Sequence, residues 1–231
     1  MAIRIGHASA TEERKAKNGK AGDQAREVCI RNYYDSTWEY ILRCKDSRKA
    51  EIMASACESG CENAAIGYDQ NERNTLRREA AKVNWDLSKI TTPCECDCSS
   101  FMTVCAEAAG INIPYTKGNA PTTSTMRTEF KSTGMFDVFA ATVSKKRGDI
   151  IVKKGHTVMV LDDEEVTVKY FKKYTGAGGS IVDALNSIGE KSTLTYRKEI
   201  AKANNISDYC GSAKQNLDML SLLKQGKLIK P

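Results

Sequence analysis

The densest set of reactive side chains lies in residues 94–98, where three cysteines alternate with a glutamate and an aspartate. From Cys98 onward, apolar and small residues recur at the spacing of an α-helix, and Gly110 ends the pattern. The spacing predicts a helix that begins at Cys98. A thiol in the first helical turn meets the positive end of the helix dipole and unpaired backbone N–H groups, which favour the thiolate and can hold an oxyanion. Cys98 is therefore our candidate nucleophile, with a lowered pKa.

A cysteine nucleophile also needs a base, and the chain has two histidines, His7 and His156. His156 begins an alternating apolar stretch, 156–161, which predicts a β-strand with His156 on the same face as Val158 and Val160. A single histidine is more often structural than catalytic. A sheet packed on the cysteine helix would bring His156 to Cys98, however, and this pairing favours His156 as the base.

The same cysteines suggest a rival chemistry, a zinc site. Cys94, Cys96 and Cys98, together with His156, supply ligand types that zinc prefers. Their spacing is tighter than that of common zinc motifs, and no second cysteine pair is well placed. We therefore expect no metal and no other cofactor, with Cys94 and Cys96 in a loop beside the active site.

Hydrophobic periodicity predicts the elements that position these residues. We expect helices over about 23–33, over 47–65, after a cap at Asp69, from Cys98 to 109, and near 126–131. We expect strands over 150–152, 156–161 and 166–171, separated by short polar turns. Several helices followed by an antiparallel sheet indicate an α+β fold.

The composition changes after the last predicted strand. Residues 175–180 contain three glycines and predict a flexible linker. We expect a catalytic domain over 1–174 and a small all-α domain over 181–231. Helices near 181–185, 196–204 and 213–223 would bury the core of that second domain.

The order of these motifs resembles that of the papain-like cysteine peptidases of the cell wall, the NlpC-type peptidases and their CHAP amidase relatives. The resemblance rests on residues 97–101 (Asp-Cys-Ser-Ser-Phe), on 148–150 (Gly-Asp-Ile) and on His156 in an apolar strand, and it covers about residues 90–171. It implies a papain-like fold in which Cys98 attacks an amide of the peptidoglycan stem or cross-bridge. It also implies that His156 acts as base and then as acid, and that Asp97 holds the substrate's free amine, with Ser99 as a further substrate-binding residue.

Three features depart from that family pattern. Ser100 stands where the family has a second glycine, and the aromatic-Gly-Gly signature near the N-terminus is not recognisable. The polar residue that should orient the histidine is also missing. Asp162 shares a strand face with His156, but at a rise of about 3.3 Å per residue it would lie roughly 20 Å away. A backbone carbonyl, a water molecule or an N-terminal residue such as Asp23 could orient His156 instead.

Residues 180–231 resemble a short helical module at the ends of phage lysins and other wall hydrolases of Gram-positive bacteria. The resemblance implies that this part of the chain binds the cell wall. Basic and amide groups suit glycan or anionic polymer surfaces, so the expected contact residues are Arg197, Lys198, Gln215 and Asn216. The alternative is that the side chains of this segment simply form a small core.

The composition is that of a globular protein, with 41% apolar and 28% charged residues. The net charge of +6 only weakly favours an acidic partner, and no nucleic-acid partner is expected. No apolar run is long enough to span a membrane, and the first residues lack the apolar core of a secretory signal. Without such a signal, the nine cysteines indicate a reduced compartment, where Cys29, Cys57 and Cys61 are expected to be buried core residues.

Together with the resemblance, these features predict a bacteriolytic phage endolysin, made in the host cytoplasm without a signal peptide and acting on peptidoglycan after release. It would be an endopeptidase or an N-acetylmuramoyl-L-alanine amidase, and its oligomeric state stays open. Two alternatives remain. One is a noncatalytic wall-binding or phage structural protein with a degenerate papain-like fold, and the other is a zinc-dependent amidase.

Overall fold

Two compact units make up the chain. The computed structural model describes residues 2–164 and 169–231, and the division between the units falls between Glu165 and Val166. The glycines at 175–180 predict a boundary at residue 174 instead. Phe171 and Tyr174, however, pack with the apolar residues of the second unit. The chain therefore enters that unit before it reaches the glycines.

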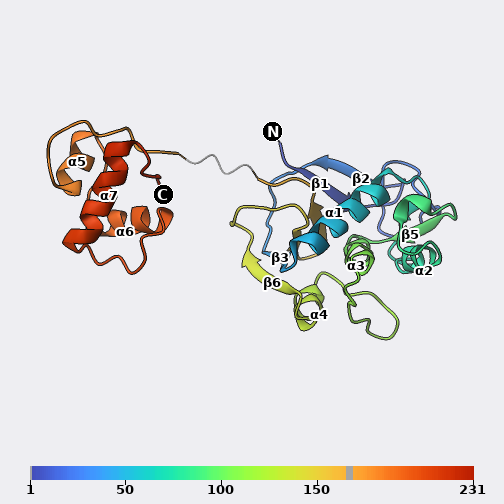
Figure 1. Ribbon diagram of the computed structural model, residues 1–231. Coiled ribbons are helices and arrows are strands. Elements are labelled where there is room, and N and C mark those ends of the chain that lie inside the picture. The colour runs from blue at the N-terminus through green and yellow to red at the C-terminus, as the bar shows by residue number, and fades with distance from the viewer. Residues whose placement is uncertain (1, 165–168) are drawn as a thin grey trace. The chain divides into compact units, whose positions relative to one another are not determined.

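A six-stranded antiparallel sheet forms the centre of the first unit, with the strand order β2-β1-β8-β7-β3-β6 (Figure 1). Its strands are β1 (Arg4–Ala8), β2 (Val28–Asn32), β3 (Tyr40–Cys44), β6 (Phe136–Ala140), β7 (Ile150–Lys153) and β8 (His156–Val160). The predictions of β7 and β8 are confirmed. The other strands come from segments before and between the helices, so the predicted order of helices followed by a sheet is wrong, although the mixed α and β composition is confirmed.

The helix predicted over 23–33 is also wrong. Arg26 has a left-handed backbone, with φ 61°, and Val28–Asn32 pairs residue by residue with β1. Pairing with a distant strand outweighs the local apolar spacing, which is a weak signal by itself. The strand predicted over 166–171 begins in residues outside the described part of the chain, and Tyr170 forms a single bridge with Ile229.

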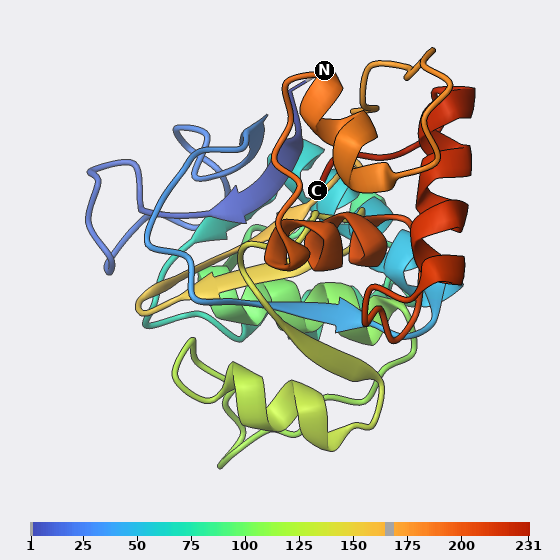
Figure 2. The same cartoon turned by 90° about the vertical axis from the view of Figure 1, so that its left-hand side faces the viewer.

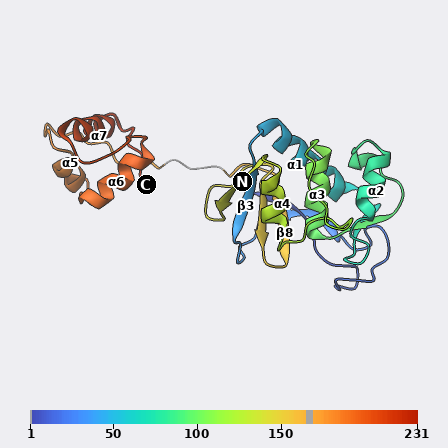
Figure 3. The same ribbon diagram turned by 90° about the horizontal axis from the view of Figure 1, so that it is seen from below.

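Helices α1 (Ser47–Glu62) and α3 (Cys98–Ala108) lie side by side against one face of the sheet (Figures 1 and 3). They run in opposite directions, since Lys49 near the start of α1 donates to the Ala109 carbonyl at the end of α3 at 2.7 Å. Both helices were predicted and are confirmed. Asp46, not Ser47, caps α1, because its carboxylate accepts two backbone N–H groups of the first turn.

The remaining regular elements of the first unit are β4 (Ile66–Tyr68), α2 (Thr75–Lys82), the short 3-10 helix η1 (Leu87–Lys89), β5 (Cys94–Cys96) and α4 (Met126–Ser132). Strands β4 and β5 pair in parallel as a separate sheet. Helix α4 confirms the prediction near 126–131 and packs against β6 (Figure 2). Helix α2 begins well after the predicted cap, because the Asp69 carboxylate binds the N–H groups of Gly19 and Asn71.

The main apolar core fills the space between the helices and the sheet. It includes Phe101 of α3 and Met159 of β8. Gly6 allows β1 to pack closely on α1, since an added Cβ would collide with the sulfur of Cys57. Cys57 is buried, as predicted. A smaller apolar cluster on the opposite face of the sheet is formed by Ile5, Ile41, Ile151, Val158 and Val160, with Tyr34 and Trp38 packed against it.

The second unit contains helices α5 (Ile181–Ser187), α6 (Leu194–Ala203) and α7 (Ala213–Gln225), close to the predicted positions. Each begins at a hydroxyl cap, provided by Ser180, Thr193 and Ser212 in turn. Gly226 ends α7 with a left-handed φ of 71°. Among the described residues of both units, no helix has the length and apolar character needed to cross a membrane.

Candidate active site

Cys98 occupies the first position of α3, and Asp97 caps that helix. The Asp97 carboxylate accepts the Ser100 N–H at 2.7 Å, and the Ser100 hydroxyl accepts the Asp97 N–H at 2.8 Å. This reciprocal capping box holds the start of the helix in one conformation. Ser100, which replaces a glycine of the resembled family, therefore has a defined capping role.

Arg73 anchors the same turn from outside the helix. Its guanidinium lies 2.6 Å from the Asp97 carboxylate and 2.9 Å from the Ser99 hydroxyl. It also donates to the carbonyl oxygens of Ala120 and Pro121. Asp97 and Ser99 were expected to contact substrate, but both are buried and their polar atoms are directed to the cap and to Arg73. Their substrate role stays a prediction, while their structural role is visible.

The Cys98 sulfur lies at the start of β8, where it receives the backbone N–H of Thr157. The Leu161 N–H donates to the backbone carbonyl oxygen of Arg4 in β1. Alternate residues of a strand direct their N–H groups to the same side. The Thr157 N–H therefore also points toward β1. Strand β1 pairs with β8 only through Ile5 and Gly6, so no β1 partner is left for Thr157. The end of this ladder leaves the Thr157 N–H, next to His156 in sequence, free to bind Cys98.

Aromatic rings enclose His156. The His7 ring, from β1, lies edge-on to it at 5.7 Å between centroids, and the Trp38 ring is stacked at 6.2 Å. Tyr34 in turn lies 5.7 Å from Trp38. Burial is the main cause that raises the pKa of Tyr34, and nearby Cys98 adds to the rise. Residues from α3, β1, β8 and the segment after β2 thus meet at one place.

Burial sets the protonation states of this site. It lowers the pKa of His156 to about 4, and Lys153 and Arg31 act in the same direction. It also lowers the pKa of His7 to about 4, assisted by His156. Burial and then Asp97 raise the pKa of Cys98 to about 12, although two backbone N–H groups oppose them. The predicted lowering of the Cys98 pKa is therefore wrong, because burial outweighs the helix start.

His7 is the site residue that sequence reasoning missed. It is 3% exposed, and its Nδ1 atom has no hydrogen-bond partner in the described structure. The alternation of apolar residues at positions 3 and 5 could have signalled a strand that carries His7 on the same face. Asp23, one of the groups that could have oriented His156, instead accepts the N–H groups of Ala25 and Glu27 within its own loop.

Cys94 and Cys96 lie in strand β5, so the predicted loop is wrong. Both are buried, and the Cys96 thiol donates to the Gly67 carbonyl of β4 at 3.4 Å. Burial raises the pKa of Cys94 to about 12. Across residues 2–164 and 169–231, no three His, Cys, Asp or Glu side chains are arranged to hold a metal ion.

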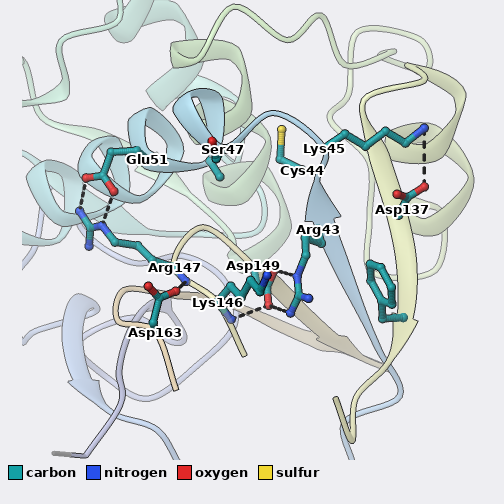
Figure 4. A pocket seen from close by; sticks show the side chains of 12 residues that line it. Arg43, Cys44, Lys45, Ser47, Glu51, Asp137, Lys146, Arg147, Asp149 and Asp163 are labelled. Carbon is teal, nitrogen blue, oxygen red and sulfur yellow. Dashed lines mark hydrogen bonds and ion pairs between the residues drawn. The ribbon is translucent and has the colours of Figure 1, made fainter. Parts of the chain in front are cut away.

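A polar cleft of about 500 Å³ at the start of α1 is lined by none of the candidate catalytic residues (Figure 4). Asp149, from the Gly-Asp-Ile motif, lies between Arg43 and Lys146 in it. Two guanidinium nitrogens of Arg43 donate to its carboxylate at 2.8 and 2.7 Å. Gly148 of the same motif packs on α1, where a Cβ would lie 2.5 Å from the Ala50 carbonyl oxygen. The motif therefore joins the sheet to α1.

In the second unit, three of the four predicted wall-contact residues hold the fold together. Arg197 donates to the Tyr209 hydroxyl at 2.9 Å and to Asn216 at 2.8 Å. Gln215 completes the capping box of α7. Lys198 alone of the four lines a surface depression, of about 490 Å³, beside the loop that follows α6.

Comparison with known proteins adds one match. A family model described as an endolysin-like domain matches residues 5–167. The match includes Cys98, His156 and His7 and spans nearly all of the first unit. No curated protein and no solved structure matches the chain.

Proposed function

Since the chain belongs to the endolysin-like domain family, we propose that it is a phage-type lytic enzyme that hydrolyses an amide bond of peptidoglycan, with Cys98 as nucleophile and His156 as base. Family membership supports the lytic activity and the substrate. The contact of the Cys98 sulfur with the N–H of Thr157, the residue after His156, supports the cysteine mechanism. A helix-borne cysteine packed on an antiparallel strand that begins with histidine also suits a papain-like fold.

In the proposed reaction, the Cys98 sulfur attacks the amide carbonyl carbon while His156 takes the thiol proton. Burial keeps both groups uncharged, so attack and proton transfer occur together rather than from a preformed ion pair. Backbone N–H groups at the start of α3 stabilise the oxyanion. The Ser100 N–H does not take part, because it already donates to the Asp97 carboxylate. His156 then protonates the leaving amine, and water hydrolyses the thioester.

His7 is proposed as the residue that orients His156. It comes from the strand next to β8, and its ring meets the His156 ring edge-on. Because it is buried and neutral, it restricts His156 without adding a charge that would repel the imidazolium formed during the reaction. His7, near the start of the sequence, would thus take the place of the polar orienting residue that is missing from the family motif here.

Clearing of a suspension of purified Gram-positive walls tests the mechanism. The full chain should clear the suspension, and Cys98→Ala should slow clearing at least about 1,000-fold, as for loss of other catalytic nucleophiles. Cys210→Ala is the matched control, because Cys210 is an exposed thiol outside the matched family domain. Clearing at the wild-type rate by Cys98→Ala would contradict the mechanism. No clearing by the wild type would favour a noncatalytic wall-binding protein.

The bond cleaved is a separate question. Mass spectrometry of fragments released from the walls distinguishes an endopeptidase, which leaves shortened stem or bridge peptides, from an amidase, which frees whole stem peptides from the glycan. Zinc analysis of the active protein tests the remaining alternative, since a zinc-dependent amidase requires about one ion per chain.

We also propose that the second unit binds the wall through the depression beside Lys198. Lys202 lies one turn further along α6 and lines the same depression with Asp208, so positive charge is in excess there. Lys198→Glu should reduce the fraction of the full chain that sediments with walls. Lys214→Glu is the control, because Lys214 is exposed on α7 and paired with Asp218. Equal loss in both variants would indicate attraction by net charge alone.

A further inference from the structure

Two buried glutamates lie close to strand β4, outside the site already described: Glu27 accepts a backbone N–H of β4, and Glu95 lies in the paired strand β5. Glu27 precedes β2 and is 2% exposed, and Glu95 lies in β5 and is 3% exposed. One oxygen of each is satisfied by a backbone N–H: Tyr68 donates to Glu27 at 2.8 Å, and Gly22 donates to Glu95 at 2.9 Å. The second oxygen of each, Oε1 of Glu27 and Oε2 of Glu95, has no partner in the described structure.

The two carboxylates border the same part of β4. Gly67 is the register partner of Glu95, and a Cβ at Gly67 would lie 2.8 Å from Oε2 of Glu95. The same Cβ would lie 2.5 Å from the carbonyl oxygen of Gly22. Glu27 binds the next residue of β4, Tyr68. Two carboxylates and a carbonyl oxygen therefore gather around a strand position that a side chain would fill.

The ionisable groups around this position are acidic. Burial raises the pKa of Glu27 and the Tyr68 N–H opposes it, while close contact with the Glu12 carboxyl and the charge of Asp23 raise it further. Burial and then Glu27 raise the pKa of Glu95 to about 8, the Gly22 N–H opposes them, and Asp69 and Glu12 add to the rise. No lysine or arginine is among these influences on either group within the described residues. Buried carboxylates without a compensating charge are strongly unfavourable, so such a group gains a cation or a proton.

We propose that Glu27 and Glu95 bind a calcium ion between the loop over residues 9–27 and the β4–β5 pair. The donors are all oxygen atoms, which suit calcium rather than zinc or copper. No three acidic side chains surround one point in the described residues, so two carboxylates alone would not fill the calcium shell. Calcium also binds backbone carbonyl oxygens and water, and the Gly22 carbonyl and water molecules would complete the coordination. The ion would tie the loop to the strand that leads directly into Asp97 and Cys98. This site is independent of the hydrolytic mechanism.

Calorimetric titration of the metal-stripped full chain with calcium chloride is the direct test. We expect saturable binding of about one ion per chain, together with a rise in Tm, since a ligand that binds only the folded state stabilises it. Glu27→Gln and Glu95→Gln should each lose both effects. Glu13→Gln should keep them, because Glu13 lies on the same loop but is exposed and paired with Lys15. Magnesium should bind at least about tenfold more weakly, since it demands a compact octahedral shell.

Absence of binding and of any Tm rise in the wild type at about 5 mM calcium, above the Kd range of weak extracellular calcium modules, would overturn the proposal. Calcium binding that both glutamine variants retain would overturn it as well. A proton shared by the two carboxyls is the competing account. It predicts no effect of calcium and a stability that falls as the pH rises from the unfolded value of 4.5 to about 8, because the folded state then holds the extra proton.

A luminescence measurement keeps the test independent of variant folding. Terbium replaces calcium in oxygen-rich sites and emits when a nearby tyrosine is excited, and Tyr68 is the immediate neighbour of Gly67 in β4. The wild-type chain should show tyrosine-sensitised terbium emission that calcium displaces. Emission that calcium does not displace would overturn the assignment.

Discussion

The starts of α1 and α3 differ in how their polar groups are satisfied. At the start of α1, the cleft of Figure 4 is spacious, yet Arg43 is paired with Asp149 and Arg147 with Glu51. At the start of α3, aromatic rings crowd the site, but Nδ1 of His7 has no partner and the Cys98 sulfur is held by backbone N–H groups. We therefore expect the reaction at the start of α3, where a buried polar atom of His7 has no partner, rather than at the larger hollow at the start of α1, where the charges are paired.

Among the tests of this comparison, removal of the proposed base, His156, should lower activity the most. His156→Gln should reduce kcat/KM by about 10²- to 10⁴-fold, the usual range for loss of a general base, while the fold is retained. The measurement is the clearing rate of walls, with circular dichroism to establish folding. Wild-type activity in His156→Gln would show that His156 is not the base and would contradict an active site at the start of α3.

The pH profile sharpens the same comparison. Burial, with Lys153 and Arg31, lowers the pKa of His156 to about 4, and protonation removes the base. The acid limb of kcat/KM should therefore fall near pH 4 instead of near the ordinary histidine value of 6.5. Burial also keeps Cys98 as a thiol, so no second limb from thiolate formation should occur below the ordinary value of 9.0. A limb near 6.5 would indicate a solvated, charged histidine and contradict the enclosed site.

Substitution of His7 should have a smaller effect. His7→Phe should lower kcat about 10-fold with little change in KM, as for loss of other orienting groups around catalytic residues. His7→Gln keeps a polar atom near His156 and should retain more activity than His7→Phe. Equal activity of the two variants would show that His7 only fills space.

The smallest effect on catalysis is expected at the cleft. Arg43→Ala leaves Asp149 buried without its guanidinium partner and should lower the free energy of unfolding by about 2–3 kcal/mol, less than for a fully buried pair because Arg43 is 20% exposed. Urea unfolding measures this loss. Activity per folded molecule should change less than about 2-fold. A large loss of activity without loss of stability would make the cleft a functional site.

The parts of the fold that were predictable are those with strong local patterns. The helix start at Cys98 follows from i, i+3, i+4 spacing, and β7 and β8 follow from alternation. Strands β1 and β2 were missed because their stability comes from pairing with each other. That pairing is not encoded in the spacing of residues 23–33, which also fits a helix.

By itself the sequence determined which groups could do chemistry: one cysteine at a helix start and two histidines, with the order of motifs that points to a cell-wall hydrolase. Only the tertiary structure decided which atoms meet. It ended the β1–β8 ladder at Gly6, opened a place for Cys98 at Thr157 and set His7 against His156. It also reversed the expected shift in the Cys98 pKa, because desolvation depends on what surrounds a group in space and not on its neighbours along the chain.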